Sequence, residues 1–214
     1  MITDKNDIHQ FLQKLNHLKP SFYTRRNVIQ IAKELLGKIL ITQFNNQPTA
    51  VRIVETEAYN GFTDKASHAY AGKRTVRTEI MYATGGVAYV YLCYGIHHLF
   101  NVVTNNVNIP DAILIRAGEP VFGTEYMLDR TCKTKLDFTI TKGPGNVSKA
   151  LGINLDQNGK SLIKNELCIA SDNYKLAKKE IISSPRIGVD YAGEDALLPY
   201  RFYIAGNRYV SGRK

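Results

Sequence analysis

The chain has 214 residues, 44% of them hydrophobic, which is enough to bury a substantial core; we expect one domain over residues 1–214 with a leading arm at residues 1–22. Its 28 Lys and Arg against 19 Asp and Glu give a formal charge of +9, which points toward a polyanionic partner, although many basic proteins bind no nucleic acid. The three cysteines are widely spaced and form no CxxC pair, which argues against a disulfide scaffold and a zinc site. The sequence has no signal-peptide pattern and no run of ~20 apolar residues that could span a membrane. We therefore expect a soluble cytoplasmic protein.

The first clear element is an amphipathic helix near residue 28. Asn27 is placed to cap its start and Gly37 to follow its end. The apolar residues repeat at helical spacing, on Val28, Ile31, Ala32, Leu35 and Leu36. Residues 38–42 then predict a strand, and residues 45–48 a turn.

Residues 51–57 predict a second strand that ends on two carboxylates. Strict alternation would place Glu55 and Glu57 on one face and Arg52 on the other. The connection over residues 59–83 is long, rich in Gly, Asp, Lys and Arg, and includes a basic run at residues 73–77. Long connections of this kind are more often functional than passive.

A β-hairpin is expected over residues 87–104, with Tyr94 at its tip. A large ring there gains no core burial and needs another explanation. Residues 112–116 predict the next strand, which Gly118 and Pro120 are expected to end.

The turn Gly143-Pro144-Gly145 is expected to open a short helix, whose start either binds a phosphate or is an ordinary turn before a packed helix. Closing strands are expected over residues 198–210, with a turn at residues 206–207.

Acids, aromatic rings and a histidine are concentrated between Ile53 and Arg116. A carboxylate beside aromatic rings can place a general base against a flat substrate that stacks, which is chemistry suited to a nucleobase. In chain order, the motifs resemble the alkyladenine (3-methyladenine) DNA glycosylase family from about residue 23 to residue 210. The motifs that carry this resemblance are Glu55-Thr-Glu-Ala-Tyr59, Ser67-His68, Tyr89-Val-Tyr-Leu-Cys-Tyr-Gly95, Asn101, Ile115-Arg116-Ala117, Gly143-Pro144, Arg186-Ile-Gly-Val189, Ala192-Gly-Glu194 and Arg201-Phe-Tyr203.

The resemblance implies an α+β fold with a curved, mainly antiparallel sheet, surrounding helices and a protruding hairpin that inserts into DNA. That fold is similar to the carboxy-terminal domain of methionyl-tRNA formyltransferase. It also implies a monofunctional enzyme of base excision repair that works as a monomer without cofactor or metal, associated with the nucleoid in a bacterium. Its expected partner is double-stranded DNA with damaged purines: 3-methyladenine, 7-methylguanine, hypoxanthine and ethenoadenine.

The same resemblance implies roles for residues of the pocket. Glu57 matches the acid that activates water, and Arg116 and the backbone carbonyl of Ile187 match groups that hold this water. The expected walls of the base pocket are Tyr59, His68 and Tyr91, together with Asn101, whose bulk excludes the guanine 2-amino group.

Tyr94 matches the ring that fills the gap left by a flipped nucleotide, and Met81 an apolar contact near the opposite strand. The expected phosphate contacts are basic residues of the long connection and the chain end: Lys73, Arg74, Arg77, Arg208, Arg213 and Lys214. Val76, Thr78 and the pair His97-His98 depart from the family pattern, which puts the grip on DNA and the preference for the opposing base in doubt.

Several alternatives stay open at this stage. Glu55 is either a structural partner of Arg52 or of a loop amide, or itself the base. His68 is either a pocket wall or an ordinary structural histidine. The whole chain is alternatively a non-catalytic nucleic-acid-binding module, or a helix-hairpin-helix enzyme suggested by the glycines at 143 and 145.

Overall fold

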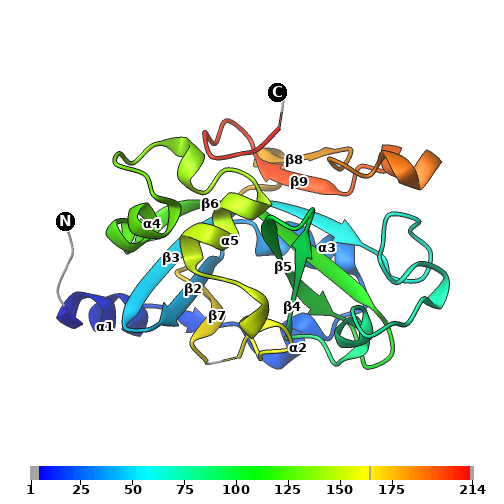
Figure 1. Cartoon of the computed structure of the whole chain (residues 1–214), viewed down its shortest axis with the longest axis horizontal. Helices are drawn as coiled ribbons and strands as arrows, with labels where there is room; N and C mark the ends of the chain where they lie inside the picture. Colours follow the sequence, from blue (N-terminus) through cyan, green and yellow to red (C-terminus); the bar gives the residue numbers. More distant parts are fainter. Residues whose placement is uncertain (1–4, 164, 213–214) are drawn as a thin grey trace.

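The computed structural model describes residues 5–163 and 165–212 and is built on one nine-stranded sheet (Figure 1). Its main path runs β1-β7-β2-β3-β6-β5-β4, and β9 pairs with both β3 and β8. The strands are β1 Asn16–His17, β2 Ile39–Phe44, β3 Gln47–Tyr59, β4 Ala88–Cys93, β5 His97–Thr104, β6 Asp111–Phe122, β7 Leu167–Ser171, β8 Ile181–Ser184 and β9 Arg201–Ile204.

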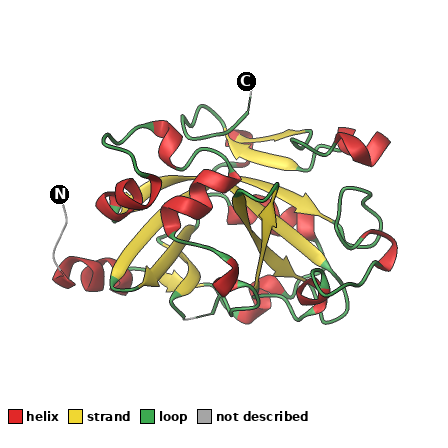
Figure 2. Ribbon diagram, in the orientation of Figure 1, coloured by secondary structure: helices red, strands yellow, loops and turns green. Residues whose placement is uncertain are grey.

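Helical segments surround this curved sheet (Figure 2). The α-helices of the described chain are α1 Lys5–Gln13, α2 Pro20–Tyr23, α3 Val28–Leu35, α4 Thr124–Thr131 and α5 Pro144–Leu151. The 3-10 helices are η1 Tyr70–Gly72, η2 Glu79–Tyr82, η3 Phe138–Ile140, η4 Leu155–Gln157, η5 Lys178–Glu180 and η6 Asp190–Leu197. Every strand pairing between described residues is antiparallel, so the predicted α+β class with a curved antiparallel sheet is confirmed.

The leading arm is part of the fold where it is described. α1 packs Phe11 and Leu12 against the sheet, and β1 pairs with β7. Residues 1–4, part of the predicted arm, lie outside the described residues, as do the expected phosphate contacts Arg213 and Lys214.

α3 forms as its sequence pattern predicts. The Asn27 side chain accepts a hydrogen bond from the Gln30 backbone N–H at 3.0 Å, and Gly37 follows the helix with a φ of 82°. Its apolar stripe is buried in the main core, as Val28, Ile31, Ala32 and Leu35.

The long pairing of β3 with β6 is interrupted by two register shifts next to the carboxylates. Ile53 pairs with Gly118 and Glu55 with Ala117, so the pairing skips Val54. Thr56 then pairs with Ile115, and the pairing skips Arg116. The strict alternation predicted for residues 51–57 is therefore wrong at this point. Bulges turn individual side chains in new directions, and the second one does so at Arg116.

β6 is longer than the sequence predicts, because neither Gly118 nor Pro120 ends it. A Cβ on Gly118 would lie 2.5 Å from Cγ2 of Val51, so the glycine lets β3 and β6 approach closely. Pro120 pairs with Val51 beside another register shift, where a missing N–H is tolerated.

The β4–β5 hairpin forms as predicted, whereas the chain end differs from expectation. Only β9 is a strand within residues 198–210, and the described residues after the turn at residues 206–207 form no second strand. β9 instead extends the sheet beside β3, with Arg201 opposite Glu57 and Tyr203 opposite Glu55. This pairing brings the carboxy-terminal part of the chain to the carboxylates.

Candidate active site

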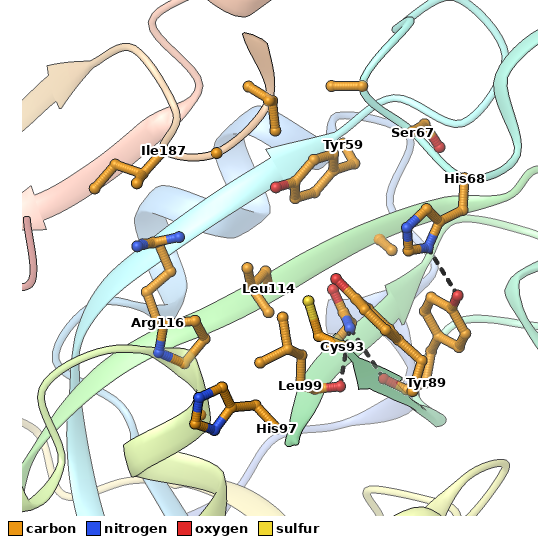
Figure 3. A pocket seen from close by; sticks show the side chains of 18 of the residues that line it. Tyr59, Ser67, His68, Tyr89, Cys93, His97, Leu99, Leu114, Arg116 and Ile187 are labelled. Carbon is orange, nitrogen blue, oxygen red and sulfur yellow. Dashed lines mark hydrogen bonds between the residues drawn. The ribbon is translucent and has the colours of Figure 1, made fainter. Parts of the chain in front are cut away.

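A cavity of about 380 Å³ opens beside the carboxylate end of β3 (Figure 3). Its volume lies in the range of ~300–1,000 Å³ that is common for small-molecule sites. Its lining includes eight predicted site residues: Tyr59, His68, Met81, Tyr91, Tyr94, Asn101, Arg116 and Ile187.

Glu57 lies beneath this lining, with an exposed fraction of 0%. Its Oε2 accepts a hydrogen bond from the Tyr59 hydroxyl at 2.8 Å. Its Oε1 accepts one from the Ile187 backbone N–H at 2.9 Å and lies 3.2 Å from Nη1 of Arg116. A carboxylate offers about four acceptor positions, so these three donors fix its orientation and leave one position for a further donor.

Glu55, by contrast, accepts four hydrogen bonds from the protein, three on Oε1 and one on Oε2. Its Oε1 accepts from Arg116 Nε at 3.0 Å, from Arg201 Nε at 2.6 Å and from the Ser211 hydroxyl at 2.9 Å. Its Oε2 accepts from the Ser211 backbone N–H at 2.6 Å. These four donors match the about four hydrogen bonds that a carboxylate accepts, so the geometry favours the structural role and the loop amide.

The alternative partner Arg52 is wrong. Its guanidinium pairs with Asp172, at 2.6 Å between Nη2 and Oδ2, and donates to the Gly37 carbonyl. The guanidinium groups that Glu55 contacts are instead those of Arg116 and Arg201.

Arg116 connects the two carboxylates. The bulge in β6 aims its side chain so that Nε meets Glu55, Nη1 meets Glu57 and Nη2 meets the Ser211 hydroxyl. Burial disfavours its charge, yet the neighbouring Glu57 and Glu55 outweigh burial and raise the pKa of Arg116. With Arg201 added, two carboxylates face two guanidinium groups, which explains how so much charge is buried at once.

Ile187 makes a contact that the sequence did not predict. Its backbone N–H, rather than its carbonyl, contacts Glu57. The part of its carbonyl in holding water stays a prediction.

His68, Tyr89 and Tyr91 form an aromatic wall opposite Arg116. His68 Nδ1 lies 2.9 Å from the Tyr89 hydroxyl (Figure 3). The centroids of the His68 and Tyr91 rings lie 4.8 Å apart in a T-shaped arrangement. Burial, followed by the charges of Arg77 and Lys73, lowers the pKa of His68 to about 4, so this ring is neutral at physiological pH. Sequence reasoning did not single out Tyr89, although its place two residues before Tyr91 on the same strand predicts the same face.

Tyr59 and Asn101 complete the pocket. Burial and then Glu57 raise the pKa of Tyr59 well above its usual range, so its hydroxyl keeps the proton that it donates to Glu57. Asn101 is buried on β5, where its Nδ2 donates to the Tyr89 carbonyl at 3.1 Å. This bond fixes the side chain at the cavity wall.

The expected DNA contacts divide into exposed and buried residues. Tyr94 is 89% exposed in the turn between β4 and β5, with a φ of 51° that non-glycine residues rarely adopt. Lys73 and Arg77 are also exposed. Met81, however, is 2% exposed; it packs in a core cluster and lines the cavity. Such burial is at odds with the expected contact to the opposite DNA strand, because a core side chain cannot reach a strand outside the protein.

A buried ion pair that sequence reasoning missed anchors the cavity roof, the lining segment from Ile187 to Tyr191. Arg186 and Asp64 form two hydrogen bonds, one of them 2.8 Å long, and Arg186 also donates to the carbonyls of Ala58 and Asp195 at 3.0 Å each. Its guanidinium lies 4.8 Å from the ring centroid of Tyr59. Arg186 thereby ties the long connection to the segment that carries Ile187.

The described residues contain no helix that is both long and apolar enough to cross a bilayer. Within residues 5–163 and 165–212, no group of three or more His, Cys, Asp or Glu side chains is arranged to hold a metal ion.

Comparison with known proteins agrees with the resemblance. The model of the methylpurine-DNA glycosylase family matches residues 21–208. A protein of Desulfitobacterium hafniense is 41% identical over 204 residues, which are 92% of this chain and 99% of the relative. A protein of Chlamydia felis is 45% identical over 188 residues, 87% of this chain and 95% of the relative. A protein of Natranaerobius thermophilus is 42% identical, with 88% of this chain and 96% of the relative covered. All three are provisionally named as 3-methyladenine DNA glycosylases.

Asp64→Asn should lower the free energy of unfolding by about 3–5 kcal/mol, because it leaves the buried Arg186 guanidinium without its counter-charge. Denaturation in guanidinium chloride measures this loss. Glu79→Gln is the matched control, since it breaks the solvent-exposed pair with Arg74 and should barely move the midpoint. Equal losses in the two variants would show that the Asp64 pair does not anchor the roof.

Proposed function

Because the chain belongs to the methylpurine-DNA glycosylase family, which makes it a DNA glycosylase, we propose that Glu57 activates the water that releases a flipped purine. The enzyme acts as a monomer on double-stranded DNA and hydrolyses the N-glycosyl bond of damaged purines. The substrates of this proposal are 3-methyladenine, 7-methylguanine, hypoxanthine and ethenoadenine. The product is an abasic site.

One observation carries this proposal: Glu57 is held by three donors beneath an aromatic cavity and keeps one acceptor position. A general base must be within hydrogen-bond reach of the proton that it takes. Glu55, two residues away, already accepts four hydrogen bonds from the protein, one more than the number of donors around Glu57. The division between the two carboxylates supports Glu57 as the base.

The aromatic wall supports a base-binding role for the cavity. A purine must leave the DNA stack before its glycosidic bond is accessible, at a cost of a few kcal/mol that is least for damaged bases. Tyr59, Tyr91 and His68 offer ring surfaces on which an extruded base stacks, a contact worth about 1–3 kcal/mol per base. Asn101 projects beside them, and we assign it steric exclusion of the guanine 2-amino group.

Water replaces the base at the sugar. As the bond between C1′ and the purine nitrogen breaks, its electron pair leaves with the base and the sugar gains oxocarbenium character. Arg116 and Ile187 orient the attacking water, and Glu57 takes its proton as the oxygen bonds to C1′. The negative charge of Glu57 also favours the cationic sugar.

Two features support a monofunctional enzyme and the wedge role of Tyr94. No lysine of the described chain lines the cavity, so a Schiff base with the sugar has no candidate amine there. Tyr94 stands exposed at the hairpin turn that borders the cavity, where an inserted ring replaces the stacking lost by the flipped nucleotide.

The parent protein should release free base from duplexes that carry each lesion and leave alkali-labile sites without nicking the strand. Glu57→Gln should keep the fold and lesion binding but lower single-turnover excision by at least about 100-fold, because an amide cannot take a proton from water. Base release measured by chromatography, with lesion affinity measured on the same duplexes, tests both statements.

Strand cleavage without alkali would replace the hydrolytic mechanism by a lyase. Binding without any release by the parent would make the chain a non-catalytic module. If Glu57→Gln excises purines at a rate within about threefold of the parent, another residue is the general base, and Glu55 is the first candidate.

Tyr94→Ala should lower excision from duplex DNA by a factor that reflects about 1–3 kcal/mol of lost stacking. Excision from single-stranded DNA should change much less, since its bases are already unpaired. Leu155→Ala serves as a control, because it removes another exposed apolar side chain that does not line the cavity. A similar loss on both substrates would remove the wedge role.

A further inference from the structure

Arg77 is exposed, but its guanidinium stacks on the aromatic wall of the cavity. The guanidinium carbon of Arg77 is 4.6 Å from the ring centroid of Tyr91, and its Nη2 is 3.5 Å from Nε2 of His68. Tyr91 and His68 line the cavity, whereas Arg77 does not. Arg77 therefore stacks on the side of the wall that faces away from the cavity.

The charge of Arg77 is not neutralised by a carboxylate. In the part of the chain that the structure describes, its guanidinium forms no ion pair. Arg74, three residues earlier, pairs with Glu79 at 2.6 Å and stacks on Tyr82 instead. Of these two arginines, only Arg77 presents an unpaired positive charge to the pocket wall.

This charge acts on the side chains of the wall. Burial raises the pKa of Tyr91 and of Tyr89, and the charge of Arg77 opposes both rises. For His68, Arg77 is the second cause, after burial, of the lowered pKa. The cation is thus close enough to influence the groups that a bound base would touch.

A cation behind an aromatic ring weakens the attraction of the opposite face for a second cation. Cation–π attraction depends on the negative potential of the ring face, and like charges on either side of a ring repel each other. A neutral base loses little by comparison, because its stacking is mainly dispersion and desolvation. The two classes of damaged purine, cationic N-alkylated bases and neutral deaminated bases, are therefore affected differently.

We propose that Arg77 is a specificity-determining residue that weights the pocket toward neutral purine lesions and against cationic ones. This inference rests on the proposed function, since it requires a purine against the inner face of Tyr91. It differs from a phosphate contact, the role expected from the sequence, because a phosphate contact would strengthen binding of all lesions alike.

Arg77→Gln tests the proposal by a ratio of rates. Single-turnover excision is measured with saturating enzyme on duplexes of one sequence that carry either cationic 3-methyladenine or neutral hypoxanthine. Neither base has a 2-amino group, so exclusion by Asn101 does not enter. The ratio of the cationic to the neutral lesion should rise about threefold to tenfold.

Two matched variants separate charge from shape and position. Arg74→Gln removes the same charge from the same segment without touching the wall and should leave the ratio unchanged. Arg77→Lys keeps the charge and should leave the ratio near that of the parent. The pKa of His68, followed by NMR of its ring, should rise from about 4 in Arg77→Gln but not in Arg74→Gln.

Equal losses on both lesions, together with a weaker salt dependence of binding, would overturn the proposal and make Arg77 a phosphate contact. An unchanged ratio with an unchanged pKa of His68 would overturn it as well. In either case excision by the parent would continue, whereas absence of excision by the parent on both lesions would refute the proposed function itself.

Discussion

The burial of two carboxylates side by side is the constraint on which this structure depends. Glu55 and Glu57 are both fully buried, and an unpaired buried charge costs several kcal/mol. Arg116 contacts both, and Arg201 contacts Glu55, so the cluster is balanced in charge. This balance allows a carboxylate to lie ionised beneath an apolar, aromatic pocket, where a base that acts on water is useful.

The arrangement of the sheet follows from the same need. A bulge in β6 brings Arg116 to the carboxylates, and the pairing of β9 with β3 brings Arg201. Ser211 closes the cluster by donating both its hydroxyl and its N–H to Glu55. Glu55 thus fixes the scaffold, and Glu57, which has three donors, remains available for chemistry.

Local patterns in the sequence predict the parts of this structure that are local. The helix after Asn27 and the hairpin around Tyr94 are confirmed because periodicity and turn residues determine them. The end predicted for β6 at Gly118 is wrong, since a glycine that ends an isolated strand also permits close strand packing.

Local patterns do not predict long-range partners: Asp64 lies 122 residues from Arg186, and Arg201 146 from Glu55. Ile187, 130 residues from Glu57, was placed at the site only by the family resemblance. No spacing rule connects residues so far apart, and only the fold shows that Arg52 is not the partner of Glu55.

The division of roles between the carboxylates is tested most directly by comparing the unfolding free energies of Glu55→Gln and Glu57→Gln. We predict a loss of about 3–5 kcal/mol for Glu55→Gln and a clearly smaller loss for Glu57→Gln. The reverse order, or a Glu55→Gln protein as stable as the parent that no longer excises bases, would contradict it.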